Sequence, residues 1–413
     1  MSPPARPKVP LRVQIPVYGA GMFSNSMTDV GTVVLPIWLH GLGASTAMIG
    51  LVIGARHILP FFFSIHGGAL MDRLGARRLM ALCSGLSMLL IFSFPLQTWL
   101  PLVAVLQMIN GYCASMGWIG AQTAFGKLLN SNPAYAGRFA FGLRMGSFIG
   151  PPIAGFAWDN LGIWGGFASF AMWSAGTMIC ALLLPEVPGT RAGGPRPFLA
   201  RDLIPRLSDY RAAAHLAAIP VMSVVLVVTM LRVSASSIQD SFYPVYLQSI
   251  GMSATQIGLL ITVASAVAAF SALAVGPMSH LLSPVWLLIA SGFGSIFFVA
   301  ITPLQESFLS LAIVAALRGV CMGISQPLML SILANAAGAG SLGVGAALRT
   351  TANRLSSGIT PIAMGYTAHF IGLQTSFLVI GALLIVLMAA IAIHVWRHPH
   401  LARADEDEEP AAS

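Results

Sequence analysis

Charged side chains are scarce in this sequence. Aspartate, glutamate, lysine and arginine together make up 8% of the 413 residues, and hydrophobic residues make up 56%. Soluble domains carry roughly 25% charged residues. A chain with so few charges cannot keep most of its surface in water. The composition therefore excludes an ordinary soluble domain and indicates an integral membrane protein.

Cysteine and the common catalytic motifs are also scarce or missing. The sequence has four cysteines, all inside apolar stretches and without metal-like spacing: Cys83, Cys113, Cys180 and Cys321. We expect neither a disulfide framework nor a metal site. The sequence contains no Gly-x-Ser-x-Gly, no His-Glu-x-x-His and no Gly-x-x-x-x-Gly-Lys-Ser/Thr motif. We therefore expect no catalytic residues, no enzyme activity, no cofactor and no nucleotide-driven pump.

Long apolar runs are what the sequence has in quantity. A bilayer core about 30 Å thick requires about 20 apolar residues per helix. Stretches of this kind recur along the chain, separated by short polar or Gly/Pro breaks. They predict an all-α membrane protein with twelve spans near residues 15–39, 46–67, 79–96, 101–125, 139–158, 163–184, 216–248, 254–278, 284–302, 307–331, 347–368 and 373–395.

The basic residues are distributed unevenly over the connections between these spans. Sixteen of the 21 lie in alternate connections and at the two ends: Arg6, Lys8, Arg12, Arg73, Arg77, Arg78, Lys127, Arg138, Arg191, Arg196, Arg201, Arg206, Arg211, Arg349, Arg397 and Arg403. The other connections hold none. This pattern predicts a bacterial-type inner membrane protein with both termini in the cytoplasm. It also explains the net charge of +8 without a nucleic-acid partner.

The two halves of the chain are related to each other. A shift of 208 residues superposes Gly50 on Gly258 and Gly111 on Gly319, and a shift of 210 superposes Pro151 on Pro361. We expect a six-helix bundle over residues 1–184, a cytoplasmic linker over 185–214, a second six-helix bundle over 215–396 and a cytoplasmic tail over 397–413. A duplication of this kind predicts a monomer whose bundles rock about a site near the membrane midplane.

The connection after the second span, "GGALMDRLGARR", has an unusual pattern of glycines and charges. It resembles the signature loop of the major facilitator superfamily, and the matching residues are Gly68, Asp72, Arg73, Gly75, Arg77 and Arg78. The resemblance implies a loop that latches the outward-open state, with Asp72 capping a helix or pairing with an arginine such as Arg138. The simpler alternative is a positively charged turn without a gating role.

A second stretch, "GSFIGPPIAG" in the fifth span, combines closely spaced glycines with two prolines. It resembles an element that the same superfamily associates with antiporters, here formed by Arg144, Gly146, Gly150, Pro151 and Gly155. Glycines four and five residues apart make a groove for a partner helix, and the prolines favour a kink. The resemblance implies export of the solute. Ordinary packing of small residues is the alternative.

Seven ionisable side chains fall inside the predicted spans, where a charge costs at least about 2.5 to 3.5 kcal/mol. Five are arginines and two are aspartates, so pairing alone leaves a positive surplus. An anionic group of a solute would match it. We expect the solute and the protons to bind at Asp29, Arg56, Asp240, Arg318 and Arg232. Asp29 and Arg56 lie at similar depths and are expected partners, although that pairing can also be purely structural.

These features together predict a secondary active transporter for a small organic solute in the lipid bilayer. Buried charges, two related halves and a gating loop are what such a protein needs. We expect efflux by proton antiport, and the alternative is proton-coupled uptake of an organic anion.

Overall fold

The structure is a computed structural model of the chain. It describes residues 9–129, 133–185, 220–279, 283–337 and 342–399. The side chains of several helical residues inside these ranges, Asp72 and Arg73 among them, lie outside the description.

The described residues form helices connected by short turns. The longer helices are α1 (Leu11–Gly41), α2 (Thr46–Ala55), α3 (Ile58–Leu74), α4 (Ala76–Ser93), α5 (Leu100–Leu128), α6 (Pro133–Leu183), α8 (Pro220–Ser249), α9 (Ala254–Ser271), α11 (Pro284–Ala300), α12 (Phe308–Ala337), α13 (Leu342–Ile371) and α14 (Leu373–Arg397). Short helical turns occur at η1 (Phe94–Leu96), η3 (Ala272–Ala274), α10 (Val275–Ser279) and η4 (Thr302–Leu304).

The predicted twelve spans correspond to twelve helical rods. Two of the rods are interrupted: α2 continues into α3 after a break at Arg56 and His57, and α9 continues through η3 into α10. One long helix, α6, contains two rods that meet at Gly162, whose φ of 67° is not helical. A residue with positive φ interrupts a right-handed helix, and glycine adopts that conformation without steric cost.

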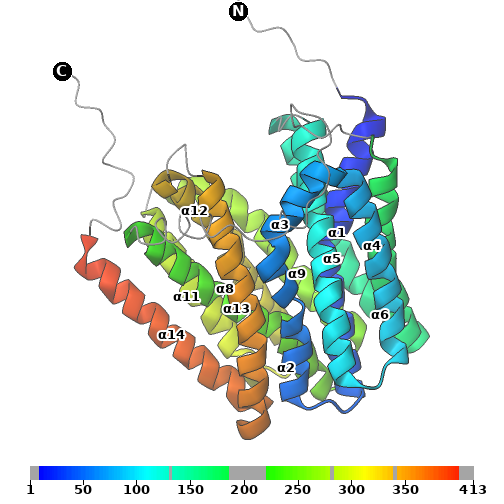
Figure 1. Cartoon of the computed structure of the whole chain (residues 1–413). Coiled ribbons are helices and arrows are strands. Elements are labelled where there is room, and N and C mark those ends of the chain that lie inside the picture. The colour runs from blue at the N-terminus through cyan, green and yellow to red at the C-terminus, as the bar shows by residue number, and fades with distance from the viewer. Residues whose placement is uncertain (1–8, 130–132, 186–219, 280–282, 338–341, 400–413) are drawn as a thin grey trace, which may run out of the picture.

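The rods are arranged in two groups (Figure 1). Helices α1 to α6 form the first bundle and α8 to α14 form the second. The first residue of α1 and the last residue of α14 lie at the same end of the molecule, which we call the near end. The start of α2 and the end of α13 lie at the opposite, far end.

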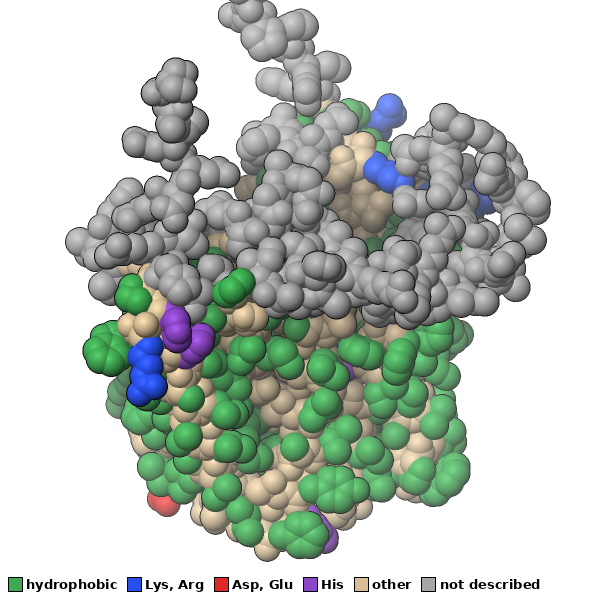
Figure 2. Space-filling model, turned by 60° about the vertical axis from the view of Figure 1, so that its left-hand side comes forward, with side chains coloured by type: hydrophobic (Ala, Val, Ile, Leu, Met, Phe, Trp, Pro, Cys, Tyr) green, Lys and Arg blue, Asp and Glu red, His purple; other side chains and the backbone are tan. Residues whose placement is uncertain are grey.

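The outer surface is that of a protein surrounded by lipid. Eight stretches of the described residues are long and apolar enough to cross a membrane, and one of them, Tyr135–Leu183, covers both rods of α6. Hydrophobic side chains predominate on the face seen in Figure 2. Large apolar side chains such as Phe270, Phe370 and Trp396 are exposed on the surface of the protein. Lipid contact explains this exposure, because an aqueous surface would not carry so many.

The relation between the halves is visible in the packing of their helices. Gly111 of α5 approaches the backbone carbonyl of Arg56, and Gly319 of α12 approaches the carbonyl of Ala264. Both pairs are related by the shift of 208 residues found in the sequence. The two bundles therefore repeat the same close contact, which only glycine permits at such short backbone separation.

Candidate functional site

Four of the predicted intramembrane charges come together between the bundles. Asp29 lies on α1, Arg56 ends α2, Asp240 lies on α8 and Arg318 lies on α12. The charge of Arg56 interacts with both aspartates, and the charge of Asp240 also interacts with Arg318. The side chain of Asp240 is exposed, whereas those of Arg318 and Arg232 are buried. The candidate site therefore has residues from both bundles.

Asp29 and Arg56 do not form the ion pair that their depths suggest. Arg56 Nη2 donates to Thr28 Oγ1 at 3.0 Å, and the Asp29 carboxylate lies near Ser147. No ion pair between Asp29 and Arg56 occurs in the described part of the chain. Successive residues on a helix point about 100° apart, so a guanidinium directed at Thr28 is turned away from the next carboxylate. Both charged groups lie near neutral hydroxyls in this conformation.

The remaining predicted member, Arg232 of α8, lies in the second bundle. Only 3% of Arg232 is exposed, and its charge interacts with those of Arg318 and Arg349. In the sequence, Arg349 is counted with the cytoplasmic connections although it stands at the start of the span predicted over 347–368, and the structure places it inside α13. Sequence reasoning therefore missed one arginine of the site. Its signal was the recurrence of polar residues on one face of α13 at Arg349, Asn353, Ser356 and Thr360.

Two seams close the space between the bundles toward the far end. In the first, Gly50 of α2 lies against the Pro361 carbonyl of α13, and Thr46 lies against Gly365. In the second, Gly258 of α9 lies against the Pro151 carbonyl of α6. Gly155 lies against Ala254 in the same seam. The repeat of about 208 to 210 residues relates the two seams, so each half contributes the same two helices.

The antiporter-like stretch thus faces two different neighbours. Gly146 and Gly150 lie against side chains of the first bundle, including Ser26 and Val30 of α1, whereas Pro151 and Gly155 face the second bundle. Arg144 is exposed. The small residues of this stretch allow close contact with α1 inside the first bundle and with α9 across the bundles.

The prolines do not break α6, whose one non-helical residue among those described is Gly162. Proline has no N–H, so Pro152 leaves the carbonyl of Phe148, four residues earlier, without its helical donor. Thr262 Oγ1 of α9 donates to this carbonyl at 3.0 Å. A hydrogen bond across the seam therefore replaces the one that the proline removes from the helix.

A carboxylate fastens the second seam at its outer edge. Asp159 of α6 accepts from the N–H groups of Ala254 (3.0 Å) and Thr255 (2.8 Å), and from Thr255 Oγ1 (2.6 Å). These groups belong to the first turn of α9, where N–H groups lack helical partners and negative charge is stabilised. Partial burial raises the pKa of Asp159, but the hydrogen bonds from Thr255 and Ala254 lower it by more, so the pKa lies below its usual value.

The first seam has a different polar contact. Arg354 Nη1 of α13 lies 3.5 Å from His57 Nδ1, in the break between α2 and α3. The position equivalent to Asp159 holds His369, which forms no hydrogen bond to α2 within the described residues. The two seams are alike in backbone packing and unlike in their charged contacts.

The superfamily-like loop lies at the near end, between α3 and α4. Gly75 has a φ of 86° and separates the two helices. Asp72 and Arg73 belong to α3, but their side chains, like the environment of Gly68, lie outside the described residues. Arg77 is half-buried and Arg78 is exposed. Arg138 Nη1 donates to Gln14 Oε1 of α1 at 3.2 Å.

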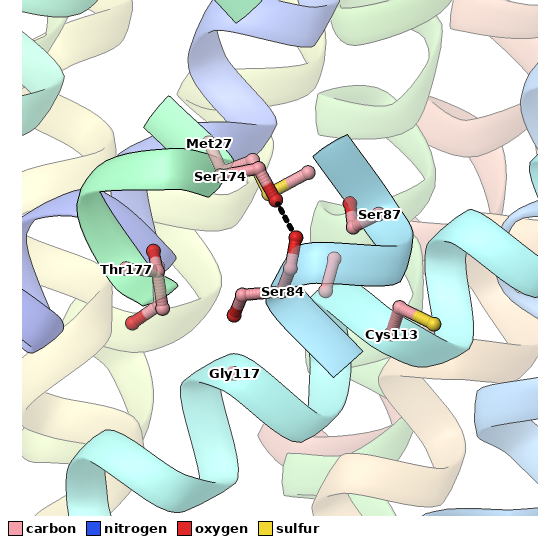
Figure 3. A pocket seen from close by; sticks show the side chains of 9 residues that line it. Met27, Ser84, Ser87, Cys113, Gly117, Ser174 and Thr177 are labelled. Atoms are coloured by element: carbon pink, nitrogen blue, oxygen red, sulfur yellow. Dashed lines mark hydrogen bonds between the residues drawn. The ribbon is translucent and has the colours of Figure 1, made fainter. Parts of the chain in front are cut away.

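A small polar pocket occurs inside the first bundle (Figure 3). Its walls come from α1, α4, α5 and α6, and include Ser84, Ser87, Cys113, Ser174 and Thr177. Ser174 Oγ donates to the Ser84 carbonyl at 2.8 Å, and Ser87 Oγ donates to Asn110 Oδ1 at 2.6 Å. Most of its hydroxyls are used by neighbouring groups. The pocket therefore belongs to the packing of one bundle and is separate from the charged site.

Two repeated bundles, a charged site shared between them and closure at one end define a membrane transporter of the alternating-access type. The family model described as Major Facilitator Superfamily matches residues 17–237 and 225–413. The chain belongs to this superfamily and is a transporter, not an enzyme.

Curated relatives and solved structures agree with this assignment. The enterobactin exporters EntS of Salmonella typhi and of Citrobacter koseri are 26% and 27% identical to the chain, over 87% of it and 88% of their own length. The nucleoside transporter NupG has the same fold, with a TM-score of 0.71, 16% identity, and coverage of 93% of this chain and 98% of its own. A bacterial homolog of the human lysosomal transporter Spinster, in an inward-facing and unoccupied conformation, gives a TM-score of 0.69 at 16% identity, with coverage of 95% and 98%. The chain is thus a multi-pass protein of a bacterial inner membrane.

Proposed function

We propose that this protein exports a small organic solute from the cytoplasm and that a proton moves inward in exchange. The observation that carries the proposal is the charged site between the bundles, with Asp29 and Arg56 on one side and Asp240 and Arg318 on the other. A carboxylate that loses a neighbouring positive charge takes up a proton more readily, so binding of a proton can alternate with binding of a solute. The resemblance to enterobactin exporters supports the outward direction.

The proposal includes the orientation of the molecule. The sixteen basic residues favour a cytoplasmic near end, so the conformation with closed seams at the far end is the inward-facing one. Reporter fusions after Ala200 and after Ser413 are expected to report the cytoplasm, and a fusion at Gly43 the opposite side. A periplasmic signal at Ala200 would contradict both the orientation and the direction of transport.

Transport itself is tested with purified protein in proteoliposomes that have an imposed pH gradient. Enterobactin, the solute named for the similar exporters, is the first labelled probe. Inside-out vesicles with an acidic lumen are expected to accumulate it, and collapse of the gradient with a protonophore is expected to stop accumulation. Accumulation that survives the protonophore would exclude proton coupling.

Asp29 is the residue we propose for the proton. Asp29→Asn removes its titratable group and keeps its size, so pH-driven transport should be lost while exchange of solute across the membrane continues. Glu306→Gln is the matched control, because it neutralises an exposed carboxylate outside both the charged site and the seams. If Asp29→Asn keeps its normal pH dependence, the same test is applied to Asp240→Asn.

The latch is also part of the proposal. We propose that Asp72 and Arg73 hold the near end closed in the outward-facing state, on the strength of the superfamily pattern. Asp72→Asn should then slow transport with little loss of folded protein and shift cysteine labelling toward the inward-facing state. Normal transport with unaltered labelling would support a simple charged turn.

A second candidate is proton-coupled uptake of an organic anion. The observation that favours it is the excess of arginine over aspartate at the site. Right-side-out vesicles distinguish the two directions. Uptake driven by an acidic exterior would favour symport, and its absence together with export would favour antiport.

A further inference from the structure

Unpartnered polar atoms are concentrated in the second bundle. In the described part of the chain, every buried side-chain nitrogen or oxygen without a hydrogen-bond partner belongs to residues 232–353. They are Arg232 Nε, Ser236 Oγ, Gln239 Oε1, Gln248 Oε1, Ser295 Oγ, Arg318 Nε and Nη1, Arg349 Nε and Asn353 Oδ1. A buried polar group without a partner costs about 1 to 3 kcal/mol, and more when it is charged. Native proteins keep few such groups without a use for them.

Most of these atoms lie on helices that face one another. Residues 232, 236 and 239 of α8 share one face, as do residues 349 and 353 of α13. The helices α8, α12 and α13 contact one another pairwise. Thr360 Oγ1 of α13 donates to Ser234 Oγ of α8 at 3.0 Å, which fixes the two helices side by side. The charge of Arg232 interacts with those of Arg318 and Arg349.

The charges at this place do not cancel. The charge of Arg232 interacts with those of two other arginines, and 3% of Arg232 and 8% of Arg318 are exposed. Asp240 is the one carboxylate of the described second bundle whose charge interacts with Arg318. The other described carboxylate of this bundle, Glu306, lies beside Tyr246 near the far end. Three positive charges and one negative charge leave a surplus of two. Buried charges of this kind require partners.

We infer that Arg232, Arg318 and Arg349 bind a doubly charged oxyanion group, such as a phosphate monoester or a pair of carboxylates. Three guanidinium groups from three helices offer forked donors that match such oxygens. The free oxygens of Gln239 and Asn353 accept hydrogen bonds from hydroxyl or amide groups of the same molecule. If this molecule is the transported solute, the inference rests on the proposed function. The solute then carries two negative charges.

Binding is measured on the purified full-length protein in detergent, without transport. The probes are inorganic phosphate and succinate, with chloride at equal ionic strength as the reference. Both oxyanions should raise the midpoint of thermal unfolding in a saturable manner, because they bind the folded state alone. Chloride should not. Arg318→Gln and, independently, Arg232→Gln should weaken the apparent affinity by about tenfold or more.

Arg397→Gln is the matched control, since it removes an exposed arginine from the end of α14. It should keep the response of the unaltered protein. An equal response in all variants would mean that the anions bind elsewhere and would overturn the inference, as would the absence of any response to phosphate or succinate. If the anions bind as described but no vesicle transports a solute, the site stands and the proposed function fails. If transport occurs while neither Arg318→Gln nor Arg232→Gln changes anion binding, the inference fails alone.

Discussion

The first and second bundles use their buried polar side chains differently. In the first, Ser87, Asn110 and Gln107 form a chain of hydrogen bonds, and Trp173 Nε1 donates to Ser26 Oγ at 2.7 Å. In the second, side-chain nitrogens of Arg232 and Arg318 lack hydrogen-bond partners. Polar groups inside the first bundle therefore join its helices to one another, whereas several of those inside the second bundle lack partners within the described residues.

The seams repeat this contrast on a smaller scale. Glycines and prolines make the same backbone contacts in both seams. The polar contacts differ: Asp159 fastens the second seam, and Arg354 contacts His57 in the first. Backbone packing follows the duplication, and charge does not. Two kinds of substitution test this difference between backbone packing and charge. The first kind should affect both halves equally, and the second should affect only one half.

The largest effect is expected from filling the seams. Gly50→Val and Gly258→Val should each abolish transport, because a Cβ atom would collide with the Pro361 or Pro151 carbonyl and keep the far end open. Maleimide labelling of Ala254→Cys, in a protein whose native cysteines are replaced, should increase in both variants. Gly41→Val is the control, since its Cβ meets no atom within 4 Å. A large effect in only one variant would contradict the equivalence of the seams.

A loss confined to function is expected in the second bundle. Arg318→Met should lower transport at least about tenfold and leave the midpoint of thermal unfolding unchanged or higher, because it removes a buried charge whose Nε and Nη1 lack hydrogen-bond partners and keeps an apolar chain of similar length. Labelled-solute flux and thermal unfolding are measured on the same preparation. A clear fall in the unfolding midpoint would show that Arg318 is a structural residue.

The opposite result is expected in the first bundle. Asn110→Ala should cost about 1 to 3 kcal/mol of stability, because Ser87 and Gln107 lose their shared partner inside the protein. Transport per folded molecule should change little. Chemical unfolding in detergent and flux normalised to folded protein provide the two readouts. An Asn110→Ala protein that is stable but inactive would remove the distinction between the bundles.

The smallest effect is expected at Asp159. Asp159→Ala should moderately increase labelling of Ala254→Cys, since it removes three hydrogen bonds at an exposed edge. His369→Ala should leave the first seam unchanged. The pKa of Asp159 is lower in the closed seam than in the open one. Asp159 therefore stabilises the closed seam fully at any pH above the ordinary carboxyl pKa. This stabilisation is lost only as the pH falls through the lowered pKa of the closed seam. Labelling that rises between pH 8 and pH 5 would therefore come from another group.

The sequence predicts the helices well because lipid imposes a simple pattern. Apolar runs and their Gly/Pro breaks locate each rod, and Gly162 interrupts α6 at the predicted connection. Side-chain partners are harder to predict. Asp29 and Arg56 have matching depths, but depth does not fix the direction of a side chain around its helix, and Thr28 receives the guanidinium.

Arg349 of the charged site and Asp159 of the second seam were missed for different reasons. Arg349 lies near a polar connection, and its membership of α13 becomes clear only from the polar face that continues to Thr360. Asp159 follows an apolar run as an ordinary turn residue would, and its partners lie about 95 residues away on α9. No local pattern identifies a contact across that distance.

Pro152 has a consequence for the energetics of opening. The Phe148 carbonyl is bonded by Thr262 only while the second seam is closed. When the bundles separate, that carbonyl and the hydroxyl both need hydrogen bonds from solvent, because the proline withholds the donor that an ordinary helix would supply. Wetting of the seam is then a required part of the conformational change. Osmotic stress, which lowers the activity of water, should therefore favour the closed far end.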